Sequence, residues 1–253
     1  MKILAIMGSP RKTGNTYKVT KKVEERMKQL GDAEFEYVFL RDMRLGQCLG
    51  CQVCFDKGEE HCPLKDDRAL LEEKMHRADG VIFASPTYAF NISGLMKNFF
   101  DRLGYACHRP RFFKSALVLT TSGVGMGANI MMISFRLVPQ TWGFKVNSLN
   151  VMTNGIPEFN PPQHKTDKKI ARAADRFYRS VAAGRPEPDI LSMAAFATAR
   201  GQIRKTPGDM FDHRYYKEHG WFEKDACYYY DPQAGALKKM LARQLGKLLG
   251  VFT

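Results

Sequence analysis

The chain has 253 residues, of which 44% are hydrophobic, and it carries a formal net charge of +13. This composition excludes a disordered chain and provides enough apolar residues for one sizeable domain with an appendage, or for two small domains. No stretch approaches the roughly 18 to 20 apolar residues of a membrane-spanning helix, and the N-terminal apolar run is too short for a signal peptide. We therefore expect a cytoplasmic protein, in which thiols stay reduced.

The positive charge comes from 39 Lys and Arg residues against 26 Asp and Glu residues. Such an excess favours an acidic partner, an anionic ligand or a membrane surface. The sequence contains no zinc-finger, RNA-recognition or basic-zipper pattern, so nucleic acid is not among the expected partners.

The first part of the chain begins with a short apolar run, residues 2–8, that is typical of a buried strand. A polar loop over residues 9–16 follows it. Apolar side chains then recur at helical spacing among lysines and glutamates, at Val19, Val23, Met27 and Leu30. A second strand is predicted at 34–40, before a loop at 48–62 that holds four of the six cysteines.

The same alternation of helix and strand continues from residue 66 to residue 184. Three further strands are predicted at 80–85, 115–121 and 144–152. Four further helices are predicted at 66–79, 93–103, 128–142 and 166–184. Asp66 or Asp67 would open the first of these helices, and Ser93 is the predicted N-cap of the second.

Five strands that alternate with helices indicate an α/β protein with a parallel sheet covered on both faces. A flavodoxin-like, doubly wound, five-stranded sheet fits this length, whereas a barrel would need eight units and about 250 residues. In this topology the loops after strands one, three and four meet at one edge of the sheet, where ligands bind. The loop after strand two, with its four cysteines, opens on the same edge.

We predict that residues 1–184 form this domain and that residues 185–253 form a C-terminal extension. The extension contains an aromatic segment at 221–231, which could cover a flavin site or form an interface. It closes with a basic amphipathic helix at 236–252, for which packing against the core or another subunit is favoured over contact with an anionic membrane. The apolar face of this helix consists of Leu237, Met240, Leu241, Leu245, Leu248 and Leu249.

The loop after the first strand, GSPRKTGNT, has the residues of a phosphate site. Its small residues let the backbone approach an anion, and the N–H groups at the start of the helix point toward the same place. Hydroxyl groups and positive charges lie beside them, and Asn15 is the candidate helix cap. The loop lacks the lysine spacing of a P-loop and the G-x-G-x-x-G of a dinucleotide site. Phosphate binding is favoured over an ordinary turn with polar caps.

The loop after the third strand, ASPTYAFNISG, suits a flat aromatic ligand. Pro86 stiffens the loop. A hydroxyl, an aromatic ring and an amide are presented around it by Thr87, Tyr88 and Asn91. The alternative is a rigid turn in which Tyr88 only packs against its neighbours, but a phosphate loop one strand away favours ligand binding.

These two loops and the strand order resemble the NADPH-dependent FMN reductase family over about residues 1–183. The resemblance implies that FMN is bound. The residues that would hold its phosphate are Ser9, Arg11, Lys12, Thr13, Gly14, Asn15 and Thr16. The residues that would border the isoalloxazine are Pro86, Thr87, Tyr88, Ala89, Phe90 and Asn91. The loop after strand four matches the family only in part, and its candidates are Thr121, Ser122, Gly123 and Gly125.

The four clustered cysteines have the spacing C-x2-C-x2-C-x7-C, formed by Cys48, Cys51, Cys54 and Cys62. Runs of C-x2-C-x2-C are typical of cubane iron–sulfur ligation, whereas zinc sites usually take two separated pairs. We predict a [4Fe–4S] cluster, with a zinc site and a metal-free reactive thiol pair as the alternatives. Beside an FMN site, this motif resembles the iron–sulfur flavoprotein branch of the same family. The remaining Cys107 and Cys227 are expected to be incidental.

The predicted function follows from these two centres. FMN accepts two electrons and can release them singly, and a [4Fe–4S] cluster carries one electron at a time. We predict an oxidoreductase that passes electrons between NAD(P)H or a ferredoxin and an acceptor, with no catalytic acid or base. The resemblance implies a homo-oligomer, a dimer or a tetramer. The alternatives are a metal-free NAD(P)H-dependent FMN or quinone reductase, and a flavin redox sensor or electron-transfer module without turnover.

Overall fold

The computed structural model describes residues 1–123, 128–153 and 161–251, and the chain divides into two compact units. The first unit comprises residues 1–49, 64–107 and 111–186. The second unit comprises residues 50–63, 108–110 and 187–253. Most of the cysteine loop therefore belongs to the same unit as the C-terminal helices.

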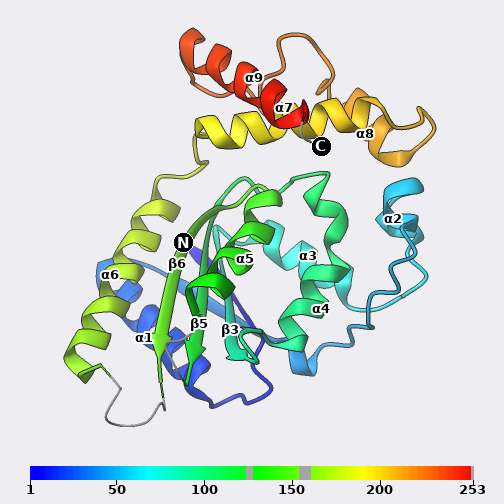
Figure 1. Cartoon of the computed structure of the whole chain (residues 1–253). Helices are drawn as coiled ribbons and strands as arrows, with labels where there is room; N and C mark the ends of the chain where they lie inside the picture. Colours follow the sequence, from blue (N-terminus) through cyan, green and yellow to red (C-terminus); the bar gives the residue numbers. More distant parts are fainter. Residues whose placement is uncertain (124–127, 154–160, 252–253) are drawn as a thin grey trace. The chain divides into compact units, whose positions relative to one another are not determined.

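The first unit is built on a parallel sheet with the strand order β2-β1-β3-β5-β6 (Figure 1). Its strands are β1 (Lys2–Met7), β2 (Glu34–Phe39), β3 (Gly80–Tyr88), β5 (Ser115–Ser122) and β6 (Lys145–Met152). A two-residue strand that the sequence did not predict, β4 (Asn91–Ile92), pairs antiparallel with the end of β3. The five-stranded order is that of a flavodoxin-like doubly wound sheet, so the predicted fold class is confirmed.

Helices cover both faces of this sheet, as Figure 1 shows. On one face, α1 (Asn15–Leu30) and α6 (Gln163–Ala182) pack on the strands through apolar side chains such as Val23 and Phe177. The other face is covered by α3 (Arg68–Arg77), α4 (Gly94–Arg102) and α5 (Ala128–Thr141). Burial on both faces explains why β1 is apolar at five successive positions and does not alternate.

Aromatic packing fixes α4 against the sheet. The rings of Phe99 and Phe100 lie 6.3 Å and 5.7 Å from the ring of Phe83 on β3. Ser93 caps the helix, because its Oγ accepts a hydrogen bond from the N–H of Met96 at 3.2 Å, as the sequence predicted. Two short 3-10 helices, η1 (Leu40–Asp42) and η3 (Gly104–Cys107), lie in connections of the same unit.

The second unit is helical and has an aromatic core. Its elements are α2 (Val53–Asp56), η2 (Glu59–His61), α7 (Ile190–Arg204), α8 (Phe211–Glu218) and α9 (Ala236–Val251). Phe196, Tyr216 and Trp221 are at most 5% exposed in its core, and Tyr229 packs against them. The aromatic segment 221–231, whose role the sequence left open, therefore supplies core side chains of this unit.

The closing helix α9 packs against α7 through small residues. A Cβ atom on Gly246 would lie 2.6 Å from the Cβ of Ala197, so only glycine allows this approach. Several members of the predicted apolar face do not pack: Leu237, Met240, Leu241 and Leu248 are exposed. The helix thus packs within the second unit, as expected, but these four side chains do not form the close contact, and packing against another subunit stays a prediction.

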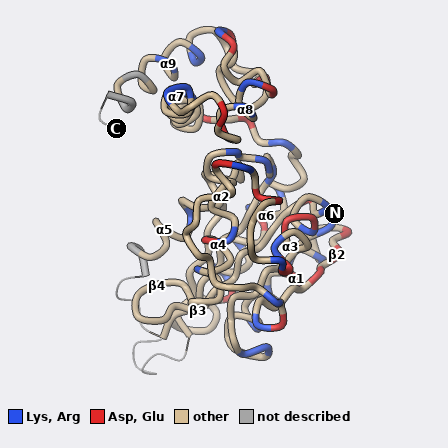
Figure 2. Tube along the Cα trace, turned by 90° about the vertical axis from the view of Figure 1, so that its right-hand side faces the viewer, with Lys and Arg blue, Asp and Glu red and all other residues tan. Residues whose placement is uncertain are grey.

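The charges are distributed unevenly between the helices. Lys and Arg are interleaved with Asp and Glu along α1 and α3, whereas α9 carries Lys and Arg alone (Figure 2). Within the described part of the chain, no helix has both the length and the apolar character needed to cross a membrane.

Candidate functional site

Hydroxyl pairs join the three predicted ligand loops at the carboxyl edge of the sheet. The Oγ1 atoms of Thr16 and Thr121 lie 2.8 Å apart and are buried, which links the start of α1 to the end of β5. The Oγ1 atoms of Thr87 and Thr120 also lie 2.8 Å apart, which links the end of β3, within the second predicted loop, to β5. The structure thus brings residues of the three loops together where a doubly wound sheet binds ligands.

The first loop leaves the start of α1 open. Gly14 occupies the N-cap position, and its carbonyl accepts the N–H of Lys18 at 3.1 Å. Asn15 is the first helical residue, so the prediction that it caps the helix is wrong. Since Gly14 has no side chain to cap the first turn, the N–H groups there are available to an anion.

Ser9 stabilises the turn that precedes this helix. Its side chain is buried, and its Oγ accepts the N–H of Arg11 at 3.2 Å. A cavity of about 480 Å³ opens beside the turn. The residues that line it are Arg11, Lys12, Thr13, Gly14, Asn15 and Lys18. Lys12 also forms an ion pair with Asp42 at 2.6 Å, so its charge is partly neutralised.

Lys18 is a lining residue that the sequence reasoning missed. It lies four positions after Gly14, and this spacing places it on the same side of the helix as the loop. The spacing can be read from the sequence only when Gly14, and not Asn15, is taken as the residue before the helix. A second cavity of about 290 Å³ is also lined by Lys18 and extends to Thr153, directly after β6.

The second loop is a tight hairpin between β3 and β4. Tyr88 pairs with Asn91, and the two residues between them have positive φ angles, 46° at Ala89 and 61° at Phe90. Tyr88 and Phe90 are 43% and 57% exposed, so two aromatic side chains are available at the sheet edge. Such backbone angles cost a residue with a Cβ atom about 1 kcal/mol or more.

We expect Ala89→Gly to raise the free energy of unfolding by roughly 0.5 to 1 kcal/mol, because glycine adopts a positive φ without strain. Urea denaturation of both proteins would measure the difference. Ala183→Gly is the matched control, since Ala183 is exposed with a φ of −71° and should lose stability on the same change. Equal losses for both variants would contradict the assignment of strain to the hairpin.

The third predicted loop begins near the carboxyl end of β5, whose last residue is Ser122. Ser122 is 4% exposed, and its Oγ has no hydrogen-bond partner among the residues that the structure describes. Gly123 beside it has open space where a Cβ would stand. Gly125 lies outside the described residues. Because buried hydroxyls are nearly always hydrogen-bonded, Ser122 and the nearby cavities fit a polar ligand such as FMN.

The entrance of the cysteine loop is held by two polar side chains of the first unit. The Oδ1 of Asn98 accepts the N–H of Cys48 at 3.1 Å, and its Nδ2 donates to the carbonyl of Gly46 at 3.1 Å. Asp66 accepts the N–H of Gly46 at 2.8 Å and pairs with Arg102 at 2.8 Å. Although burial alone would raise the pKa of Asp66, the ion pair with Arg102 and the hydrogen bonds from the N–H groups of Gly46 and Arg68 outweigh it and lower the pKa.

The rest of the cysteine loop belongs to the second unit. Cys51 is exposed, and Cys54 and Cys62 are partly buried. Gln52, at the start of α2, has a φ of 60°. Across the described residues, no three His, Cys, Asp or Glu side chains are grouped as a metal site. The predicted set of four thiolate ligands therefore stays a prediction. Outside this loop, Cys227 is buried in the second unit, and Cys107 accepts a hydrogen bond from Thr141.

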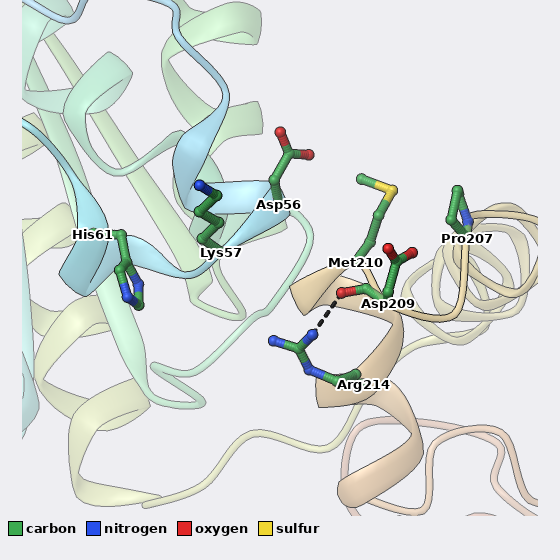
Figure 3. Close-up of a pocket in the computed structure, with 7 residues that line it drawn as sticks. All are labelled: Asp56, Lys57, His61, Pro207, Asp209, Met210 and Arg214. Carbon is green, nitrogen blue, oxygen red and sulfur yellow. Dashed lines mark hydrogen bonds between the residues drawn. The ribbon is translucent and has the colours of Figure 1, made fainter.

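A cavity of about 580 Å³ lies beside the cysteine loop within the second unit (Figure 3). Its lining comes from α2 and η2 on one side and from the start of α8 on the other. The lining residues are Asp56, Lys57, His61, Pro207, Asp209, Met210 and Arg214. Positive and negative side chains are mixed in this lining, so the cavity favours no ligand of one charge.

Comparisons with known proteins decide the family. Residues 1–154 match the model of the NADPH-dependent FMN reductases. The chain belongs to the NADPH-dependent FMN reductase family. It is 30% identical over 194 residues to an iron–sulfur flavoprotein of Clostridioides difficile, covering 76% of this chain and 84% of that protein. It is 31% identical over 188 residues to an iron–sulfur flavoprotein of Archaeoglobus fulgidus, covering 71% and 83%. The predicted family and branch are thus confirmed.

Solved structures support the fold. RosB with bound 8-demethyl-8-formylriboflavin-5'-phosphate superposes with a TM-score of 0.57 at 15% identity, over 93% of this chain and 92% of RosB. The NAD(P)H:quinone oxidoreductase of Methanothermobacter marburgensis gives a TM-score of 0.53 at 19% identity, over 71% and 96%. The activity follows from the family match over residues 1–154, which makes this chain a flavin oxidoreductase.

Proposed function

We propose that this FMN reductase relative passes electrons between NAD(P)H or a reduced ferredoxin and an acceptor, through FMN and a [4Fe–4S] cluster. The observation that carries the flavin part is the buried hydroxyl of Ser122, which has no hydrogen-bond partner among the described residues and lies beside the loops that the Thr16–Thr121 and Thr87–Thr120 pairs join. FMN would supply the conversion between two-electron and one-electron transfer. The chain's own residues would bind and orient it.

The roles of the loops follow from their contacts. Arg11, Lys18 and the open first turn of α1 would hold the phosphate. Tyr88 and Phe90, presented by the strained hairpin, would border the ring system. Ser122 would donate or accept one hydrogen bond from the ligand. None of these groups needs to gain or lose a proton for electrons to pass.

The assignment of a [4Fe–4S] cluster is supported by the chemistry of its four cysteine ligands. Four thiols within fifteen residues, spaced C-x2-C-x2-C-x7-C, are the ligands that a [4Fe–4S] cluster takes. The relatives named as iron–sulfur flavoproteins support the same assignment. Cys48, Cys51, Cys54 and Cys62 would hold the four irons. The proposal also includes a homo-oligomer, a dimer or a tetramer of this chain.

A metal-free NAD(P)H-dependent FMN or quinone reductase is the second candidate. The observation that favours it is the absence of any three-residue metal group among the described residues. In that case Cys51, which is exposed, and its neighbours would be structural or redox-active thiols.

One preparation separates the two candidates. The full chain is purified anaerobically, and iron and acid-labile sulfide are measured against flavin. About four irons per flavin and a broad shoulder near ~400 nm are expected for the cluster. Flavin bands without iron after anaerobic reconstitution would leave the metal-free reductase. If the protein does not oxidise NAD(P)H with a flavin or quinone acceptor, with or without the cluster, a ferredoxin-type donor or a module without turnover is favoured.

Ser122→Ala tests the flavin site. Because the hydroxyl has no partner among the described residues, its removal should leave the stability of the apoprotein unchanged or slightly higher. The same change should weaken FMN binding by roughly 5- to 30-fold through one lost hydrogen bond. Fluorescence titration with FMN and thermal unfolding of the apoprotein give the two readouts. Ser134→Ala, on α5 away from the loops, is the control for a lost hydroxyl. Unchanged FMN affinity would remove Ser122 from the site.

A further inference from the structure

Arg109 is fully buried inside the second unit and bonds to both the cysteine loop and a C-terminal helix. Its Nη1 pairs with the carboxylate of Asp212 on α8. Its Nη2 donates to the carbonyl oxygen of Cys54 at 2.9 Å and to Oε2 of Glu59 at 2.6 Å. One guanidinium thus connects α8 with α2 and with η2.

Further contacts hold this guanidinium in place. Asp212 is 1% exposed, and its second oxygen lies 2.6 Å from Nδ1 of His108. The carbonyl of His108 accepts the hydroxyl of Tyr216 at 2.8 Å. The rings that lie over the guanidinium are those of Phe211 and Tyr215. Because both oxygens of Asp212 are engaged, its carboxylate fixes the direction in which Arg109 points.

The backbone conformation at Cys54 therefore depends, through Arg109, on the side chain of Asp212, which lies 158 residues further along the chain. Geometry at a metal-bound residue is commonly set by the groups that bond to it from outside the ligand set. Removing one member of a buried ion pair leaves the other charge uncompensated, and the surroundings rearrange to solvate it. Loss of the Asp212 charge should accordingly release Arg109 from the Cys54 carbonyl.

We propose that Arg109 and Asp212 are positioning residues that set the conformation of the cysteine loop and thereby arrange its thiols for the cluster. The C-terminal extension then helps to hold the cluster's cysteine loop in place, because it contributes Asp212. The inference rests on the proposed function, because the conformation of the loop matters to chemistry only if its thiols hold the cluster.

The first test needs no cluster. Hydrogen exchange of residues 50–63 is measured in the FMN-loaded, cluster-free full chain for the wild type and Asp212→Asn. We expect exchange in this segment to become at least about 10-fold faster in the variant, with the segment 80–88 of β3 unchanged. Glu59→Gln is the second variant, since Glu59 is partly exposed and tolerates the change; it should give a smaller acceleration.

Asp209→Asn is the matched control. Asp209 is exposed, lies three residues before Asp212 and lines the cavity in Figure 3. Asp209→Asn removes the same charge from the segment directly before α8 without removing a partner of Arg109, and exchange in residues 50–63 should stay at the wild-type rate. An equal acceleration in Asp209→Asn and Asp212→Asn would overturn the positioning role.

The second test uses the anaerobically reconstituted holoprotein. Asp212→Asn should lower the iron per FMN and shift the midpoint potential of the remaining cluster upward, because an extra net positive charge nearby favours the reduced form. FMN content should not change. A potential and an electron paramagnetic resonance spectrum equal to those of the wild type would overturn the proposal.

The two tests separate this inference from the proposed function. If the wild type itself takes up no iron, the cluster assignment fails, and the exchange measurement alone decides whether Arg109 and Asp212 order the loop. If Asp212→Asn does not fold, Glu59→Gln decides instead: unchanged exchange in residues 50–63 would overturn the positioning role.

Discussion

Replacement of Cys54 by alanine should remove nearly all iron from the anaerobically purified protein while FMN stays bound. A [4Fe–4S] cluster with only three thiolates loses a corner ligand and usually breaks down or converts to another form. The expected result is a fall from about four irons per flavin to below one, with loss of the shoulder near ~400 nm. The flavin bands should persist, because the FMN loops belong to the first unit and Cys54 belongs to the second.

The control for this experiment is Cys107→Ala. Cys107 lies outside the loop, and its sulfur accepts a hydrogen bond from Thr141 at 3.2 Å. Its loss should leave both iron and flavin unchanged. An unchanged iron content in Cys54→Ala, or an equal loss in both variants, would contradict the four-cysteine ligand set. One zinc per chain in place of iron would assign the site to zinc.

Arg11→Ala combined with Lys18→Ala should weaken binding of FMN by about 30- to 300-fold, since each hydrogen bond to a charged group contributes roughly 1.5 to 3 kcal/mol and exposure reduces this. Both side chains line the cavity at the start of α1. Binding of riboflavin, which lacks the phosphate, should change by less than about 3-fold. Fluorescence titrations of the apoprotein with the two flavins measure this difference directly.

Lys28→Ala is the control for the loss of positive charge from the same helix. Lys28 lies in the last turn of α1 and pairs with Glu24 at 2.7 Å, far along the helix from Gly14. It should leave both affinities within about 2-fold of the wild type. An equal loss for FMN and riboflavin in the double variant would place the phosphate elsewhere and leave only a general effect on the loop.

The sheet could be predicted because its signal is local. Residues 3–7 form an uninterrupted apolar run, and the structure buries each of them at 1% exposure or less. Such a run, ended by a polar glycine loop, is typical of a strand buried in the middle of a parallel sheet. Ser93 could likewise be predicted as a helix cap, because its hydroxyl stands directly before a helical pattern. The family resemblance followed from loops of this kind, whose residues are close together in the sequence.

The features that could not be predicted depend on distant partners. Arg109 lies between a histidine and a proline with no pattern around it, and its partners Cys54, Glu59 and Asp212 are 50 to 103 residues away. The face by which the closing helix packs could not be predicted for a related reason. Its leucines suggested the packed face, but the close approach is made at Gly246 and the adjoining small residues, and a glycine gives no hydrophobic signal.

The chain has two tryptophans, and each unit contains one of them, Trp142 in the first and Trp221 in the second. Both are buried, so each should emit at short wavelength when folded and shift to longer wavelength on unfolding. Trp142→Phe and Trp221→Phe would therefore give two proteins whose fluorescence reports on one unit at a time. Coincident transitions in denaturant would indicate that the sheet and the helical unit unfold as one cooperative system, and separated transitions would assign each its own stability.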